Sequence, residues 1–252
     1  MKHLSIAQEN KQDNSQLTYP AKKRLIIGYI YYPIHTLFIA ALVIMAFGII
    51  FTATGAELSM RNLAYAVAVG ILVQTLVYSG LTWRFLKDEF AKFKTSLGRN
   101  IKIAIVAAVA GQIVAIPYGL LMQHLGVVPN FGENQQLAQE LLFANIPAML
   151  IVMLVLAPIW EEIFFRGMIF APIKKRSRVL AYAASALTFG LLHTLSSIRE
   201  SGISVETLVT TTFYFCTAIV FSYTYEKTGS LWGAVAAHTV SNIIGVAWMV
   251  FI

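Results

Sequence analysis

Long apolar stretches separated by short polar and basic segments recur along most of the chain. Each stretch is close to the about 20 residues that a helix needs to cross a bilayer. The pattern therefore predicts an all-α fold, a polytopic membrane helical bundle with about seven transmembrane helices. The predicted spans are residues 25–51, 63–83, 103–122, 144–170, 179–195, 207–225 and 231–252.

The composition agrees with this pattern. Of the 252 residues 58% are hydrophobic and 12% are charged, whereas soluble domains carry about 25% charged residues. The only cysteine, Cys216, excludes a disulfide framework and a cysteine-cluster metal site, and its apolar surroundings predict a core-packing residue.

The basic residues gather in the polar segments between the spans. Sixteen of the nineteen Lys and Arg lie on one side of the predicted topology, and such an excess marks the cytoplasmic side. We therefore expect a multi-pass protein of the cell membrane with a cytoplasmic N terminus, and residues 1–24 as a polar cytoplasmic tail. The net charge of +7 is explained by this orientation, so we expect the lipid bilayer and no nucleic acid as a partner.

Two carboxylates interrupt the fourth apolar stretch. Glu161 and Glu162 are the only acids within the predicted spans, and an ionisable group at membrane depth is a functional candidate. Glu162 and Arg166 are four residues apart and can pair on one helix face. Glu161 points about 100° away around the helix, so it is left available.

The last spans carry two further residue pairs at helical spacing, each with a histidine. Phe189 shares a face with His193, and His238 shares a face with Asn242. An imidazole and an amide on one face can converge on one point. Together with Glu161, the side chains of His193, His238 and Asn242 make four polar groups that are expensive to bury for packing alone.

Pro158 precedes the two glutamates and lacks the N–H that a helix requires, so a kink just before Glu161 is expected. Irregular backbone at membrane depth is tolerated beside a wet cavity, which predicts a water-accessible pocket at Glu161. At about 1.5 Å of rise per residue, the depths from the cytoplasmic ends are about 14 Å for Glu161, 10 Å for His238, 16 Å for Asn242 and 21 Å for His193. His193 fits this cluster least well.

Three ordered signatures carry a resemblance to a known family. The chain resembles the CAAX protease and bacteriocin-processing family (CPBP, also called Abi) of intramembrane endopeptidases over about residues 140–252. On this basis we expect N-terminal transmembrane helices at 25–142 and a CPBP-like catalytic core at 143–252. The signatures are EExxxR (Glu161, Glu162, Arg166), FxxxH (Phe189, His193) and HxxxN (His238, Asn242).

The resemblance implies the role of each residue. Glu161 and His193 would position and deprotonate a water molecule, and His238 with Asn242 would form an oxyanion hole. Supporting roles would fall to Glu162, Arg166 and Phe189.

The resemblance leaves the cofactor open. No cofactor is favoured, although zinc or another divalent metal is an alternative, with Glu161, His193 and His238 as its ligands. The chain has no HExxH motif, and its two aspartates lie outside the spans, so two other classes of intramembrane protease are excluded.

Two functions are therefore expected as alternatives. The first is an intramembrane endopeptidase that cleaves peptide or membrane-protein substrates, in CAAX-type processing or in bacteriocin maturation and self-immunity. The second is a non-catalytic membrane immunity or regulatory protein that keeps the motifs as a scaffold. A small transporter is disfavoured because no inverted repeat is evident.

Overall fold

The computed structural model describes residues 32–55, 59–127 and 132–251, and in these ranges it is helical and contains no strand. The predicted tail and the start of the first predicted span lie outside the described residues. The first long helices are α3 (Tyr32–Thr54), α4 (Met60–Leu81) and α6 (Leu97–His124), and the last are α11 (Arg178–Ser201), α12 (Val205–Thr228) and α13 (Leu231–Phe251).

Six helical segments of the described residues are long and apolar enough to cross a membrane, and a shorter apolar helix covers Met45–Thr54. The prediction of a polytopic helical membrane bundle is thus confirmed. The six segments correspond to the second to seventh predicted spans. The orientation of the N terminus stays a prediction.

Two segments that the sequence pattern leaves between spans are also helical. They are α5 (Trp83–Lys94) and α7 (Gly132–Ala144). On α5 the side chains of Leu86, Glu89 and Phe93 are buried, a spacing of three to four residues that places them on one helix face. This short amphipathic helix packs against α13, so it belongs to the bundle although it is too polar to span a membrane.

The fourth span is built from alternating α- and π-helical pieces. The predicted irregularity at Pro158 takes the form of a π turn, in which the Ala157 N–H donates to Val152 O. The wider turn accommodates a residue that has no N–H to donate. The pieces are α8 (Ile146–Ile151), η2 (Val152–Leu156), α9 (Ala157–Glu162), η3 (Ile163–Phe170) and α10 (Ala171–Lys174).

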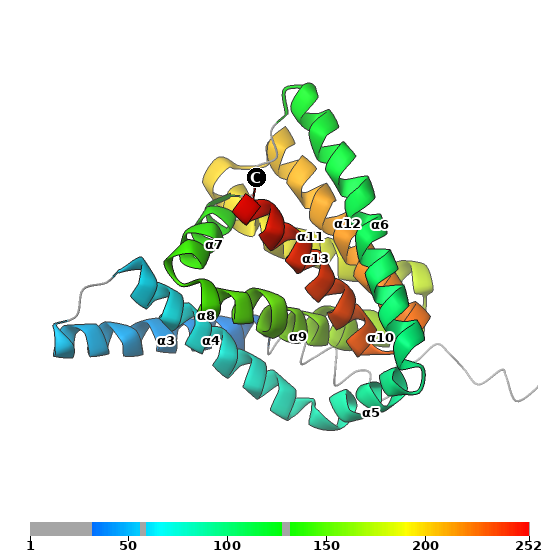
Figure 1. Cartoon of the computed structure of the whole chain (residues 1–252), viewed down its shortest axis with the longest axis horizontal. Coiled ribbons are helices and arrows are strands. Elements are labelled where there is room, and N and C mark those ends of the chain that lie inside the picture. The colour runs from blue at the N-terminus through cyan, green and yellow to red at the C-terminus, as the bar shows by residue number, and fades with distance from the viewer. Residues whose placement is uncertain (1–31, 56–58, 128–131, 252) are drawn as a thin grey trace, which may run out of the picture.

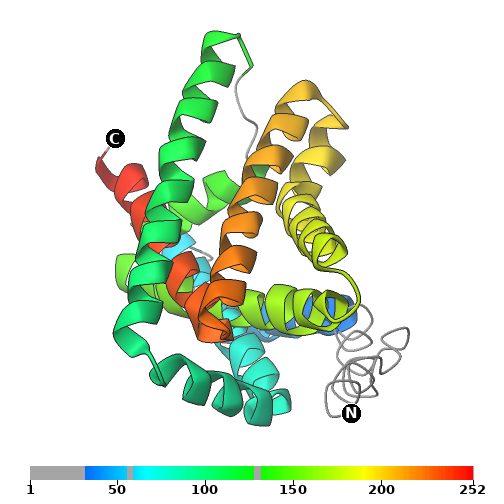
Figure 2. The same cartoon turned by 90° about the vertical axis from the view of Figure 1, so that its right-hand side faces the viewer.

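Helices α4, α11, α12 and α13 all contact this broken span. Figure 1 shows α6 and α12 side by side along one edge of the molecule, with α13 between them and α9. Figure 2 shows α11 on the other side of α12 from α6. The α11–α12 contact is close at Gly190, where an added Cβ would lie 3.0 Å from Thr211 O.

Cys216 is exposed on α12 rather than packed in the core. The prediction of a core-packing residue was therefore wrong. The reason is that apolar surroundings in the sequence do not distinguish a protein core from a surface that faces lipid.

The beginning of α13 is held by α5. The Leu231 N–H donates to Glu89 Oε2 at 2.7 Å, and Ser230 Oγ donates to Glu89 O at 2.6 Å. A carboxylate at a helix N terminus satisfies an otherwise unpaired N–H and interacts favourably with the helix dipole. Glu89 thus fixes the end of the helix that carries His238.

Glu89→Ala is expected to destabilise the protein by about 1–2 kcal/mol, the usual effect of removing such a cap. Thermal unfolding in detergent measures this change. Asp88→Ala, at the exposed neighbouring position, is the matched control and should leave the unfolding temperature unchanged. Equal effects of the two substitutions would contradict the role given to Glu89.

Candidate active site

Side chains from four segments meet beside the broken span. Glu161 and Glu162 end α9, and Arg166 follows in η3. The structure brings the carboxylate of Glu161 next to the imidazoles of His193 on α11 and His238 on α13. His193, which fitted least well by depth, is therefore part of the cluster.

The free oxygen of Glu161 is the centre of the site. Its Oε2 lies 3.7 Å from His193 Nε2 and 3.9 Å from His238 Nε2, too far for direct hydrogen bonds. The atom is buried and has no hydrogen-bond partner among the described residues. The separations between this oxygen and the two Nε2 atoms are suited to a water molecule that bridges them by hydrogen bonds.

The other nitrogen of each imidazole is already bound. His193 Nδ1 lies 2.9 Å from Phe189 O, and a carbonyl oxygen only accepts, so His193 carries a proton on Nδ1. His238 Nδ1 lies 2.9 Å from Glu162 Oε1 and donates to that carboxylate. In the neutral state, both histidines therefore present the lone pair of Nε2 to Glu161.

The predicted ion pair between Glu162 and Arg166 is present and completely buried. Arg166 Nε lies 3.0 Å from Glu162 Oε2, and Arg166 Nη1 donates to Glu162 Oε1 at 3.1 Å. Arg166 Nη2 donates to Ala218 O on α12 at 2.7 Å. One hydrogen bond and one ion contact thus hold the Glu162 carboxylate, which in turn binds His238.

Aromatic rings enclose both the arginine and the histidines. The Cζ atom of Arg166 lies 5.3–5.7 Å from the ring centroids of Phe165, Phe189 and Phe221, distances at which a cation is attracted to the ring face. Phe189 also stacks on His193, with centroids 4.1 Å apart and planes at 20°. Phe189 thus lies where its predicted supporting role requires.

Two aromatic residues of α12 were missed by the sequence reasoning. Phe221 stacks on His238 at 4.5 Å between centroids, and Tyr214 packs against His193 at 4.6 Å. The two positions are seven residues apart, and such residues share a helix face. This spacing was the available signal.

Asn242 is hydrogen-bonded to the backbone of the broken span. Its Nδ2 donates to Met153 O at 2.8 Å, and Thr239 Oγ1 donates to Leu154 O at 3.0 Å. Both carbonyls lie in the π turn before Pro158, where the proline supplies no N–H. No hydrogen bond joins Asn242 to Glu161 or to the two imidazoles in the described part of the chain. The convergence of Asn242 with His238 on one point stays a prediction.

Access to the cluster is limited. The side chain of Glu161 is 11% exposed and that of His193 is 27% exposed, whereas His238 is 6% exposed. The site is thus open mainly on the side of His193. A water-accessible pocket at Glu161 stays a prediction.

The arrangement was also tested as a metal site. Among the described residues, no group of three or more His, Cys, Asp and Glu could hold a metal ion. Ligands of a tetrahedral zinc ion lie about 3.3 Å apart, whereas the atoms that face one another here are 3.7 and 3.9 Å apart. These separations are wider than those of an ideal tetrahedral site. Whether Glu161, His193 and His238 bind a metal stays a prediction, and no chemical step below uses one.

The fold and the site define a polytopic helical membrane protein with a buried glutamate and histidine cluster. Residues 143–244 match the family model described as type II CAAX prenyl endopeptidase Rce1-like. The resemblance inferred from the three motifs is thereby confirmed for this part of the chain.

A curated relative gives a weaker likeness to the same class. The chain is 26% identical over 148 residues to a protein of Bacillus subtilis (strain 168) described as "Putative membrane peptidase YdiL". The alignment covers 57% of this chain and 55% of the relative, so the chain spans about half the length of the relative that it matches. No solved structure matches the chain.

Proposed function

We propose that the protein is an intramembrane endopeptidase of the CAAX type, which hydrolyses a peptide bond with a water molecule activated by Glu161 and His193. One observation carries this proposal. Glu161 Oε2 is buried without a hydrogen-bond partner among the described residues and faces two Nε2 atoms at 3.7 and 3.9 Å. A water molecule in this gap could donate one hydrogen to the carboxylate and the other to His193 Nε2.

The reaction then needs one proton shuttle. Glu161 accepts a proton from the water as its oxygen attacks the carbonyl carbon of the substrate, and a tetrahedral intermediate forms. The same proton passes from Glu161 to the leaving nitrogen as the C–N bond breaks, which gives a carboxylic acid and an amine. A positioned general base of this kind contributes about 10²–10⁴-fold to the rate.

The oxyanion of the intermediate needs a donor. His238 Nδ1 donates to Glu162, so His238 can donate to the oxyanion from Nε2 only when both of its ring nitrogens carry a proton. With both imidazoles neutral, Glu161, Glu162 and Arg166 give a net charge of −1, and one imidazolium makes the cluster neutral. Asn242 retains a second N–H beyond the one bound to Met153 O, and we assign it a positioning role with partial access to the oxyanion.

The substrate class follows from the comparisons only as a proposal. The family is described as a type II CAAX prenyl endopeptidase, and the relative is described as a "Putative membrane peptidase". We therefore propose a peptide or membrane-protein substrate that presents a segment to the bilayer. Bacteriocin maturation and self-immunity remain hypotheses for the cellular role.

Peptide cleavage by the purified chain tests this proposal. Fluorescence-quenched peptides with CAAX tails, each with and without a farnesyl group, are incubated with the full chain in detergent, and the cut position is read by mass spectrometry. We expect cleavage of at least one prenylated member. Absence of cleavage for the whole panel, with folded protein present, would favour the non-catalytic alternative.

Metal removal is expected to leave the cleavage rate unchanged, because the proposed base is a carboxylate and no proposed step uses a metal ion. The rate is measured before and after dialysis against a zinc chelator. A zinc metalloprotease treated in the same way is the control. Loss of cleavage that added zinc restores would contradict the metal-free mechanism.

A further inference from the structure

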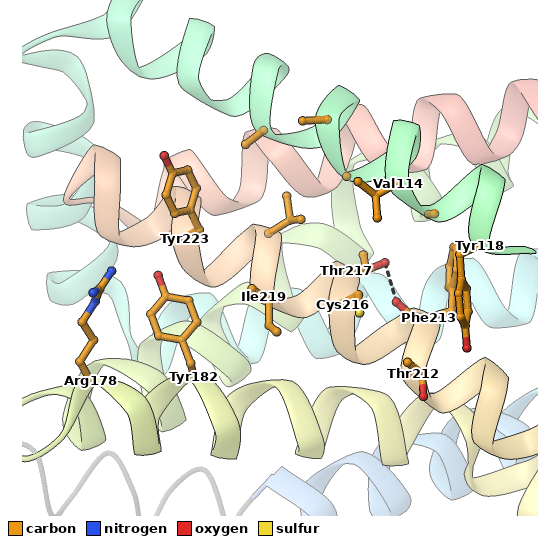
Figure 3. Close-up of a pocket in the computed structure, with 15 residues that line it drawn as sticks. Val114, Tyr118, Arg178, Tyr182, Thr212, Phe213, Cys216, Thr217, Ile219 and Tyr223 are labelled. Carbon is orange, nitrogen blue, oxygen red and sulfur yellow. Dashed lines mark hydrogen bonds between the residues drawn. The ribbon is translucent and has the colours of Figure 1, made fainter.

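An apolar cavity of about 640 Å³ lies between α6, α11 and α12, apart from the cluster around Glu161. Its wall on α6 includes small side chains and Val114, and its wall on α12 includes Cys216 and Ile219. Figure 3 shows these residues between two ends that carry different polar side chains. Thr212 and Tyr118 lie at one end, and Arg178, Tyr182 and Tyr223 lie at the other.

The cavity has the length of one leaflet. On α12 its lining extends from Thr212 to Tyr223, and eleven steps of about 1.5 Å give about 16 Å. Half of the hydrocarbon core of a bilayer is about 15 Å thick. An acyl chain that begins at the Arg178 end would therefore reach the other end near the middle of the bilayer.

The Arg178 end is strongly basic. Residues 174–178 and 226–227 contain five Lys and Arg and one acid, Glu226. Glu226 binds Lys174 at 2.9 Å and Arg178 at 2.9 Å, so one carboxylate serves two cations. The side chain of Arg178 keeps 65% of its surface exposed, and Lys227 lies over the ring of Tyr223.

Tyr182 and Tyr223 complete this end. Tyr182 donates its hydroxyl to Glu226 at 2.8 Å, and the guanidinium of Arg178 lies over its ring. Tyrosines beside basic residues are typical of the level of lipid headgroups. Basic pockets between transmembrane helices bind the headgroups of anionic lipids.

We propose that this cavity binds an anionic glycerophospholipid, with one acyl chain between α6 and α12 and the phosphate at Arg178. The length of the cavity matches an acyl chain that crosses one leaflet, and its apolar walls match the hydrocarbon of that chain. The basic end matches the negatively charged phosphate. The inference does not depend on peptidase activity. It is tested without a substrate.

Cys216 provides the probe, because it is the only cysteine of the chain, is exposed and lines the cavity. The full chain in detergent is alkylated with a small maleimide while phosphatidylglycerol or phosphatidylcholine with the same acyl chains is added. We expect phosphatidylglycerol to slow alkylation of Cys216 at concentrations at which phosphatidylcholine has no effect. Native mass spectrometry should retain one bound phosphatidylglycerol.

Arg178→Gln should weaken the protection. Each cation near an anionic lipid surface contributes about fivefold to affinity, so about five times more phosphatidylglycerol is needed for equal protection. Arg99→Gln, at an exposed position of α6 outside the cavity lining, is the matched control and should change nothing. Lys227→Gln gives a second variant if the loss of the Arg178–Glu226 pair impairs folding.

Three outcomes would overturn the proposal. Equal protection by the two phospholipids would mean that the cavity takes any acyl chain. Equal protection by a neutral prenyl alcohol would mean that the basic end contributes nothing. Protection by glycerol phosphate alone would mean that no acyl chain is bound.

Discussion

Glu161→Gln is expected to lower the rate of peptide hydrolysis by about 10²–10⁴-fold, the usual contribution of a general base. Glutamine keeps the size of the side chain and can still hold a water molecule, but it cannot accept its proton. Because Glu161 Oε2 has no hydrogen-bond partner among the described residues, the substitution breaks no hydrogen bond of that oxygen. The unfolding temperature should therefore remain close to that of the wild type, and the loss should appear in kcat.

Glu140→Gln is the matched control for this experiment, because Glu140 is exposed on α7 and has no part in the proposed mechanism. It should retain the wild-type rate. Cleavage by Glu161→Gln at the wild-type rate would contradict the assignment of Glu161 as the general base. The two histidines would then be tested as bases. If the wild type and the variant are equally active in a cellular immunity assay, the scaffold alternative gains support.

Arg166→Met is expected to destabilise the protein by about 3–5 kcal/mol, because it leaves Glu162 as an uncompensated buried charge. Both side chains are completely buried, so water cannot replace the guanidinium. The hydrogen bond to Ala218 O on α12 is lost as well. The yield of folded protein and its thermal unfolding in detergent measure this effect.

Two further variants separate the charge from the shape of the side chain. Arg199→Met makes the same substitution at an exposed position of α11 and should be neutral. The double variant Glu162→Gln with Arg166→Met should regain much of the lost stability, because no unpaired charge remains. It should still be impaired in hydrolysis, since His238 Nδ1 would lose its carboxylate partner. Equal unfolding temperatures for Arg166→Met and Arg199→Met would contradict the role of the buried pair.

Features that depend on neighbours within one helix could be predicted from the sequence. Six spans follow from hydropathy, and the Glu162–Arg166 pair follows from its spacing of four residues. The same geometry left Glu161 on another face, where it meets two imidazoles. The order of the three motifs was sufficient to indicate the family that residues 143–244 match.

Features that depend on which helices become neighbours could not be predicted. The partner of Asn242 is a carbonyl 89 residues away, and the partner of Leu231 N is Glu89, 142 residues away. The sequence does not indicate which backbone carbonyls accept side-chain hydrogen bonds. Pro158 did indicate that one carbonyl in the preceding turn would lack its usual N–H donor. Glu89 was overlooked because its segment was interpreted as a basic loop, whereas its apolar spacing is that of an amphipathic helix.

The two π-helical pieces on either side of Glu161 also bear on how such a sequence can evolve. A π turn holds one residue more than an α turn, so deletion of one residue from Val152–Leu156 would convert it to an ordinary turn. The span would remain as apolar and the three motifs would remain intact. Glu161 would keep nearly the same face, because five residues of a π turn and four residues of an α turn both rotate the chain by about 400°. What the deletion would remove is the wider turn itself, whose carbonyls accept hydrogen bonds from Asn242 and Thr239. Because of these contacts, changes in the number of η2 residues should be rare in related sequences, while exchanges among its apolar residues should accumulate freely.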